Sequence, residues 1–176
     1  MNKRIFSFVL SAALITGTAV SAQTLASADN QTPVTTTKEP TKTIAINVMD
    51  NQELGYFERA LQRTNLDRIL DRKGGSFTVF APTNDAFEKI PNQYYHRLWQ
   101  NHNGALTQLL KYHIVKGQIN AADLKDGQML KTLQGSELRV SRKGNQVYIN
   151  GAPLTATDIT SRNGVIHTVS NIAMIP

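Results

Sequence analysis

The hydrophobic residues of this chain change their spacing part-way along the sequence. In the first part they recur every three or four positions, as in Leu106, Leu109 and Leu110, and this spacing places them on one face of a helix. From Leu133 onward they alternate with polar residues, as in the stretch 138–149, which is the period of a strand with one buried face. The sequence therefore predicts helices first and strands last.

One strand interrupts the helical part. The run 77–81 is short, apolar and rich in aromatic and β-branched residues, and its flanking Gly and Pro are typical of the ends of a buried strand. The dipeptide Asn150-Gly151 favours a tight turn between two of the later strands. Helices packed against a mainly antiparallel sheet predict an α+β domain over residues 44–176.

The N-terminal residues have the pattern of a secretory signal peptide. A basic start is followed by 16 uncharged residues, Ile5 to Val20, and the small residues after them predict cleavage after Ala22, with Ala28 as a second site. The uncharged run contains Ser, Thr and Gly and is shorter than the ~20 mostly apolar residues of a membrane-spanning helix, so an uncleaved anchor is disfavoured. We expect residues 1–22 to direct export, to the extracellular space or the periplasm, with no stable membrane insertion after cleavage.

Residues 29–43 form the predicted linker. They include six Thr and two Pro but only one large apolar residue, Val34, and such a segment cannot bury enough apolar surface to become ordered. The remaining length suits a single domain. The chain has no Cys, which excludes disulfides and thiol chemistry. Its 19 Lys and Arg against 13 Asp and Glu give a formal charge of +6, which removal of Lys3 and Arg4 lowers to +4, and this surplus is too small for a nucleic-acid-binding protein.

Three segments carry a family pattern. They are Phe77-Thr78-Val79-Phe80-Ala81-Pro82-Thr83-Asn84-Asp85-Ala86-Phe87, Leu109-Leu110-Lys111-Tyr112-His113-Ile114-Val115, and Asn163-Gly164-Val165-Ile166-His167-Thr168-Val169 through Pro176. In order and spacing they resemble the first homology box, the Tyr-His box and the second homology box of fasciclin domains. The resemblance covers roughly residues 44–176. It implies a wedge of two mainly antiparallel β-sheets with helices packed on one side. It also implies a non-catalytic extracellular module for cell adhesion or contact with the extracellular matrix.

Thr83, Asn84 and Asp85 follow the buried strand of the first box and begin the next predicted helix. A Thr or Asn side chain at a helix start can accept a hydrogen bond from a free backbone N–H group. A carboxylate in the first turn is stabilised by the helix dipole. We therefore expect structural roles for all three residues.

The histidines of the other two boxes are also expected to be structural. His113 lies between the end of a predicted helix and an apolar strand, which indicates a buried, hydrogen-bonded ring rather than a metal ligand or a general base. The family resemblance implies that its partner is the Asn84–Asp85 region, and it also implies, for some members, an integrin contact through Tyr112 and His113. For His167 we expect a ring that points to solvent while its neighbours pack.

Patterns for catalysis and metal binding are missing from the sequence. The four His, at positions 96, 102, 113 and 167, form no His-Glu-x-x-His motif, and neither Gly-x-Ser-x-Gly nor Gly-x-x-x-x-Gly-Lys-Ser/Thr occurs. We therefore expect neither an enzyme nor a cofactor or metal site.

Arg139, Arg142 and Lys143 cluster on one predicted hairpin. A basic run of this kind is often only a solvated face, but it can also bind an acidic polysaccharide or a lipid head group. With the family resemblance, the cluster favours an extracellular or cell-surface macromolecule, a protein or an acidic glycan, as the partner.

A second functional hypothesis is a carrier of an apolar small molecule. Some fasciclin-like proteins hold pigments between helices and sheet, and the early helices here supply Tyr56, Phe57 and Leu61. A long apolar tunnel or groove would favour the carrier, whereas a closed core would favour the adhesion module.

Overall fold

The structure, a computed structural model, describes residues 40–71 and 74–173. The chain divides near residue 36, and every described residue belongs to the second unit, residues 37–176. The predicted signal peptide, residues 1–22, and most of the predicted linker lie outside the described residues. Within the described residues, no helix is both long and apolar enough to cross a membrane.

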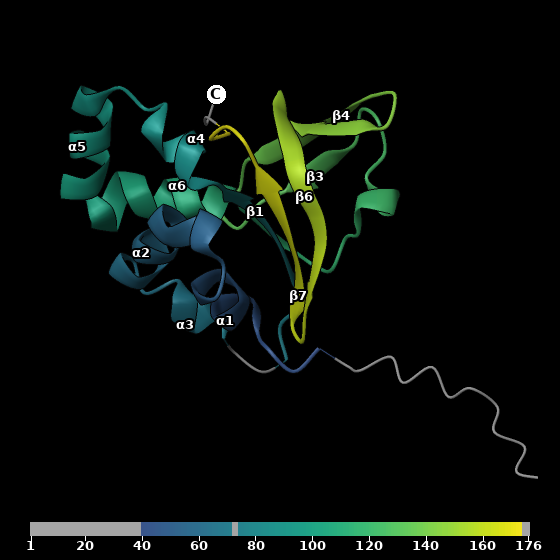
Figure 1. The fold of residues 1–176 in the computed structure, drawn as a ribbon, viewed down its shortest axis with the longest axis horizontal. Coiled ribbons are helices and arrows are strands. Elements are labelled where there is room, and N and C mark those ends of the chain that lie inside the picture. Colours follow the sequence, from purple (N-terminus) through teal and green to yellow (C-terminus); the bar gives the residue numbers. More distant parts are fainter. Residues whose placement is uncertain (1–39, 72–73, 174–176) are drawn as a thin grey trace, which may run out of the picture. The chain divides into compact units, whose positions relative to one another are not determined.

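The α+β class predicted from the sequence is confirmed (Figure 1). The helices and helical turns are α1 (Ile44–Met49), η1 (Gln52–Leu54), α2 (Gly55–Arg63), α3 (Asp67–Leu70), α4 (Asn84–Glu88), α5 (Asn92–Gln100), η2 (His102–Leu106), α6 (Thr107–Tyr112) and η3 (Ala121–Asp123). The strands are β1 (Phe77–Pro82), β2 (Ile114–Lys116), β3 (Met129–Lys131), β4 (Glu137–Lys143), β5 (Gln146–Ile149), β6 (Ala152–Ser161) and β7 (Gly164–Val169).

The strands form one seven-stranded sheet in the order β2-β1-β7-β6-β5-β4-β3. The pair β1 and β7 is parallel, and the other pairs are antiparallel. The expected wedge of two separate sheets is not confirmed. The sheet stays continuous because β6 is long: it pairs with β5 through Ala152 and Pro153 and with β7 from Leu154 onward, with register shifts beside Ala156. Such irregularities bend a strand without ending it.

The two edge strands of this sheet, β2 and β3, also contact each other. Val115, in β2, forms an isolated bridge with Thr132, directly after β3, and the Leu133 N–H donates to the Ile114 carbonyl. The edges of β2 and β3 therefore cover each other in part, which reduces the exposed edge of the sheet.

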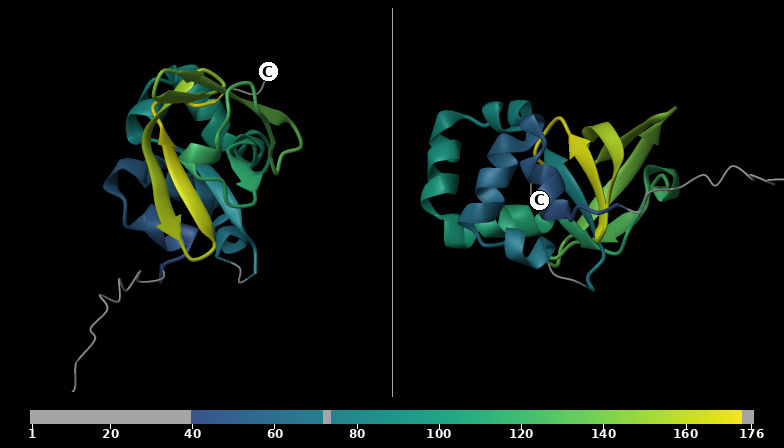
Figure 2. Two further views of the ribbon diagram at one scale, coloured as in Figure 1. Left: turned by 90° about the vertical axis from the view of Figure 1, so that its right-hand side faces the viewer. Right: turned by 60° about the horizontal axis from the view of Figure 1, so that its bottom comes forward.

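The central strands β1 and β7 separate two cores. On one side, Val79 and Ile166 pack with helix residues such as Phe57 and Leu61. On the other side, Phe80 and residues of β3–β6 fill the space enclosed by the curved sheet. The right-hand view of Figure 2 shows the blue and teal helices on one side of β1 and β7 and the later strands on the other. Because both faces are covered, every residue of β7 is buried.

Asn163 and Gly164 join the helices to this sheet. The Asn163 side chain accepts a hydrogen bond from the Ile44 N–H at 2.8 Å and donates to the Leu70 carbonyl, so it ties α1 and α3 to the turn before β7. Gly164 has a φ of +143° and lies against the backbone of Phe77, where an added Cβ would overlap the Phe77 carbonyl oxygen. Only glycine fits this approach of β7 to β1.

The last residues of the predicted linker join the fold. Thr43 is buried, precedes α1 as its N-cap, and donates from its hydroxyl to the Asp71 carboxylate at 2.9 Å. The Lys42 carbonyl accepts a hydrogen bond from the Arg162 N–H. These contacts come from residues distant in sequence, which the local composition of the linker does not reveal.

Candidate interaction sites

The Tyr-His box lies in the interior. His113 is buried, its Nδ1 lies 2.8 Å from the Leu109 carbonyl, and its Nε2 accepts a hydrogen bond from the Ala173 N–H at 3.2 Å. Since Nε2 must carry no proton to accept, Nδ1–H is the donor to Leu109. Burial lowers the pKa of His113 to about 4, although the bond to Leu109 acts in the opposite direction. The expected bond to Asn84 or Asp85 is not formed, because both ring nitrogens have backbone partners.

Tyr112 is buried beside it, in the core enclosed by the curved sheet. Its hydroxyl donates to the Glu137 carbonyl at 3.1 Å and accepts from Asn150 Nδ2 at 2.6 Å. The burial expected for His113 is observed, and the integrin contact that the resemblance implies for some members would need Tyr112 and His113 at the surface, where neither ring lies. Tyr112 also borders a surface groove, which is lined as well by Glu137 and Asn150, the two residues that its hydroxyl bonds.

The His167 ring does not point to solvent, contrary to the prediction from the sequence. Its ring is fully buried and stacks on Phe80, with 5.5 Å between the ring centroids. Nδ1 accepts from the Asp158 N–H at 3.2 Å, which leaves Nε2–H to donate to the Ile119 carbonyl at 2.9 Å. Burial lowers the pKa of His167, against the opposite effects of its bond to Ile119 and the charge of Asp158. The ring does not point to solvent, because both faces of β7 are covered.

Asn84, in the first box, connects α4 to η1 and α2 through hydrogen bonds. Asn84 Oδ1 accepts from the Tyr56 N–H at 3.0 Å, and Asn84 Nδ2 donates to the Gln52 carbonyl at 2.9 Å. Asn84 therefore satisfies a free N–H at the start of α2, whereas the expected partner was an N–H of its own helix. Thr83 is the N-cap residue of α4 but makes no capping bond through its side chain. Asp85 lies in the first turn of α4 and is exposed.

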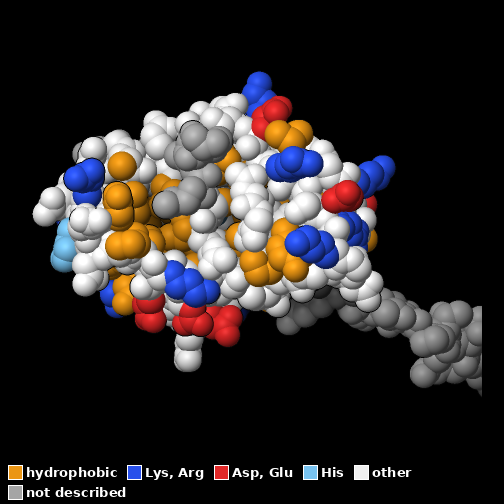
Figure 3. All heavy atoms as spheres, turned by 90° about the horizontal axis from the view of Figure 1, so that it is seen from above, with side chains coloured by type: hydrophobic (Ala, Val, Ile, Leu, Met, Phe, Trp, Pro, Cys, Tyr) orange, Lys and Arg blue, Asp and Glu red, His pale blue; other side chains and the backbone are white. Residues whose placement is uncertain are grey.

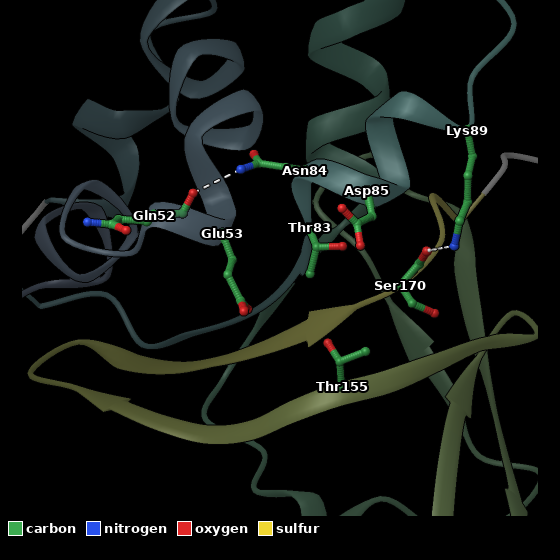
Figure 4. A pocket seen from close by; sticks show the side chains of 8 residues that line it. All are labelled: Gln52, Glu53, Thr83, Asn84, Asp85, Lys89, Thr155 and Ser170. Atoms are coloured by element: carbon green, nitrogen blue, oxygen red, sulfur yellow. Dashed lines mark hydrogen bonds between the residues drawn. The ribbon is translucent and has the colours of Figure 1, made fainter.

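These residues line a polar surface groove with a volume of about 330 Å³, which we call the first-box groove. Its walls are Gln52, Glu53, Thr83, Asn84, Asp85, Lys89, Thr155 and Ser170. Figure 4 shows the carboxylates of Glu53, from η1, and Asp85, from α4, entering the groove from different sides above Thr155 of β6.

The three basic residues of the predicted hairpin lie on or at the end of β4, but they do not share one face. Side chains alternate along a strand, so Arg139 and Lys143 project to one side and Arg142 to the other. The Arg142 guanidinium donates to the Leu124 carbonyl at 3.1 Å. The Lys143 ammonium lies 5.7 Å from the centre of the Tyr148 ring, at cation–π distance.

Arg139 and Lys143 belong to an exposed surface of the sheet. Residues opposite each other in antiparallel strands lie on the same face, and Arg139 is opposite Met129 while Ser141 is opposite Tyr148. We call this surface the β4 face and define it by Met129, Arg139, Ser141, Lys143 and Tyr148. An open groove of about 540 Å³ crosses it beside Arg139 and reaches Tyr112 and Asn150. Seen from above (Figure 3), several Lys and Arg side chains lie over the strand half and hydrophobic side chains gather over the helical half.

Within the described residues, no three His, Cys, Asp or Glu side chains come together in a way that could hold a metal ion. The first-box groove is lined by two carboxylates, Glu53 and Asp85.

Comparison with known protein families gives one decisive match. The fasciclin domain model matches residues 52–176. The chain belongs to the fasciclin domain family.

Individual relatives support this membership. Transforming growth factor-beta-induced protein ig-h3 of Oryctolagus cuniculus is 32% identical over 137 residues, which are 78% of this chain but 20% of that protein. Protein sll1483 of Synechocystis is 34% identical over 127 residues, 72% of this chain and 69% of that protein. The chain thus spans about a fifth of ig-h3 and about two thirds of sll1483.

A solved structure shows the same fold. It is a FAS1 domain pair from the insect cell adhesion molecule fasciclin I, with a TM-score of 0.65 and 17% identity, and the match covers 77% of this chain and 52% of that one. At this identity the likeness concerns the fold alone.

The side chains that tie this fasciclin domain together come largely from the three boxes. Four of these side chains bond backbone atoms. The side chains of Asn84, Asn163 and His167 bond segments outside their own boxes, and His113 bonds Leu109 at the start of its box. The sequence analysis did not predict the role of Asn163, although this polar residue directly precedes the Gly-Val-Ile start of a buried strand. It also missed Glu53, for which no local pattern gives a signal.

Proposed function

We propose that this fasciclin domain is an exported, non-catalytic module that binds an acidic polymer of a cell surface or extracellular matrix through the β4 face. The observation that carries the proposal is the placement of Arg139 and Lys143 on the same exposed face of one strand. Four residues of an extended strand span about 13 Å, so the two cations can engage two separate acidic groups of one polymer chain.

The residues between these cations suit a sugar chain. Ser141 lies between Arg139 and Lys143 on the same face and offers a hydroxyl group, and the neighbouring half-buried Tyr148 ring offers an apolar surface with a polar tip. At the other end of the strand, Glu137 repels an acidic ligand. A bound polymer would therefore run from Arg139 toward Lys143, with the Tyr112 hydroxyl at the floor of the adjoining groove.

Of the three residues expected to serve a carrier, Tyr56 borders a surface groove of about 240 Å³ that Phe87, Ile90 and Tyr95 also line. The other two residues do not support a carrier. Phe57 and Leu61 are buried against Val79 and Ile166 in one continuous core. Side chains fill the space between α2 and the sheet, so an apolar ligand has no room beside these two residues. This packing favours the interaction module.

The experiment compares retention on an immobilised sulfated glycan, heparin, for two double variants with equal loss of charge. Arg139→Gln/Lys143→Gln removes both cations of the β4 face. Lys125→Gln/Arg142→Gln removes the Arg142 cation, which projects from the opposite side of β4, and the exposed Lys125 in the loop before β3. Electrostatic attraction weakens as salt shortens the Debye length from ~10 Å at 0.1 M to ~3 Å at 1 M, so elution by NaCl reports its strength.

We expect the β4-face variant to elute at a clearly lower NaCl concentration than the wild type, and the control variant to elute close to the wild type. Stability of the β4-face variant should stay within about 0.5 kcal/mol of the wild type, because exposed residues contribute little to it. Equal weakening in both variants would mean that net charge, and not the β4 face, controls retention. Retention that ignores salt would contradict the electrostatic basis altogether.

A further inference from the structure

The walls of the first-box groove are held by hydrogen bonds. On one rim, the Glu53 N–H donates to Asn51 Oδ1 at 3.0 Å, and Asn84 Nδ2 donates to the Gln52 carbonyl. On the opposite rim, Lys89 Nζ donates to the Ser170 carbonyl at 2.9 Å. At the floor, the hydroxyl of Thr155 bonds that of Thr168 at 2.7 Å. The backbone around the groove is therefore set in place before any ligand arrives.

The side chains that enter this fixed frame are themselves unpaired. Among the described residues, the carboxylates of Glu53 and Asp85 take part in no ion pair or hydrogen bond, and the one ion pair, Lys42–Asp50, lies elsewhere. Thr83 is only 9% exposed, and its hydroxyl has no partner in the described part of the chain. Figure 4 shows this hydroxyl directed toward the side of the groove where Asp85 lies.

Buried polar groups in folded proteins nearly always have a hydrogen-bond partner, but the Thr83 hydroxyl oxygen is not fully buried: in the described residues, the fully buried unpaired side-chain atoms are Asp67 Oδ1 and Trp99 Nε1. Because Thr83 lines the groove, a partner for its hydroxyl can reach it there. Three free oxygen-bearing side chains, Glu53, Asp85 and Thr83, thus border one space, and two of them carry negative charge.

We propose that the first-box groove binds a cationic nitrogen, the ammonium or guanidinium group of a Lys or Arg side chain presented by a partner protein. An ammonium group has three N–H donors and no acceptor, which matches three acceptor side chains. Lys89 also lines the groove, so the net charge of its lining residues is −1. Its ammonium group bonds the Ser170 carbonyl and Asn171 Oδ1 and forms no ion pair with Glu53 or Asp85, so the oxygens of both carboxylates remain free to accept.

The size and composition of the groove favour a single side chain over other occupants. Its volume of about 330 Å³ is at the lower end of the range of roughly 300–1,000 Å³ for small-molecule pockets, and each residue that lines it has a polar or charged side chain. Within the described residues, no three His, Cys, Asp or Glu side chains come together in a way that could hold a metal ion, so the groove favours an organic cation over Ca²⁺. This site lies on other elements than the β4 face and has the opposite charge, so it is independent of the function proposed above.

The test is a titration of the ¹⁵N-labelled mature protein, followed by amide NMR in 0.15 M NaCl. The probes are Nα-acetyl-lysine methylamide and its uncharged analogue, Nα-acetyl-norleucine methylamide. We expect saturable shifts at the amides of Glu53, Thr83 and Asp85 with the lysine derivative and none with the norleucine derivative. This comparison needs no variant, so it does not depend on how a substitution affects folding.

Variants then assign the contacts. Glu53→Gln/Asp85→Asn should weaken binding of the lysine derivative at least tenfold, and Thr83→Val, which keeps the side-chain volume, should weaken it several-fold. Glu88→Gln is the matched control, because this exposed residue is on the same helix as Asp85 but does not line the groove. It should change the affinity less than twofold.

Several results would overturn the proposal. Equal shifts with both derivatives would show that charge is not recognised, and the absence of localised shifts would show that the groove is not a site. Saturable shifts at the same amides with CaCl₂, and none with the lysine derivative, would assign the groove to a metal ion. If n-pentylamine bound as tightly as the lysine derivative, the ligand would be a free amine and not a partner protein.

Discussion

Acid should weaken this protein through His113 in a way that one substitution can isolate. The native state holds this ring neutral, because Nε2 must accept a hydrogen bond from the Ala173 N–H. Burial lowers the pKa of His113 from its ordinary 6.5 to about 4. Between these two values the unfolded chain binds a proton that the native state does not, so the free energy of unfolding falls as pH falls from 6.5 toward 4.

The size of the effect follows from the two pKa values. At pH 7 the ring is largely neutral in both states, whereas at pH 4 it is charged in the unfolded chain and half charged in the native state. The linkage relation converts this difference into a loss of about 3 kcal/mol between pH 7 and pH 4. A domain of this kind has a total stability of roughly 5–15 kcal/mol, so the loss is easily measured. The lowered pKa of His167 adds a loss in the same direction.

The assay is urea unfolding at pH 7, 5.5 and 4, followed by the fluorescence of Trp99, the single tryptophan. His113→Gln removes the titrating group, so its unfolding free energy should fall by about 3 kcal/mol less than that of the wild type over this range. The variant can be less stable at every pH, because it alters a buried hydrogen bond, and the comparison rests on the slope alone. His96→Gln, at an exposed position, should follow the wild type. Parallel profiles for wild type and His113→Gln would refute the argument that the native state excludes this proton.

Two further predictions concern the backbone and processing. Gly164→Ala should destabilise the protein by more than about 3 kcal/mol, because the new Cβ would overlap the Phe77 carbonyl oxygen at a φ that only glycine adopts easily; a melting temperature close to that of the wild type would show that β1 and β7 can separate without cost. N-terminal sequencing of the exported protein should find a start at Gln23 or Asp29, the residues after Ala22 and Ala28, whereas a start at Met1 in a membrane fraction would show that the first segment is an anchor.

The spacing of hydrophobic residues was sufficient to predict the fold class and its buried first strand. The run 77–81 lies in the middle of the molecule, and its continuous apolar character reflects the two cores on either side of β1. The same reasoning applied to β7 would have placed His167 inside, because its neighbours on both faces are apolar. The prediction of a solvent-directed ring assumed one covered face, which is the rule for an outer strand and not for a central one.

Other features depend on contacts that local patterns do not contain. Asn84 was expected to cap its own helix, but it bonds the N–H of Tyr56, 28 positions earlier in the chain. The continuity of the sheet depends on irregular pairing inside β6, which alternation alone does not reveal. The two-sided arrangement of the basic residues, by contrast, could be read from the sequence. Side chains alternate along a strand, so once Arg139, Arg142 and Lys143 are placed on a single strand, Arg142 must face the side opposite to the other two.

The side chains that hold this fasciclin domain together differ from those proposed to bind partners. Asn84, His113, Asn163 and His167 use their polar atoms to bond backbone groups of the domain, so a resemblance carried by these residues reports the fold and not the partner. In the two proposals above, recognition is assigned to side chains that bond no other part of the domain, such as Glu53 and Asp85 in the groove and Arg139 on the β4 face. Because the Debye length is about 8 Å at physiological salt, charges at these exposed positions act mainly on a ligand already close to contact. Exchanging them should therefore change the partner while the domain keeps its fold, and altering Asn84, His113, Asn163 or His167 should do the reverse.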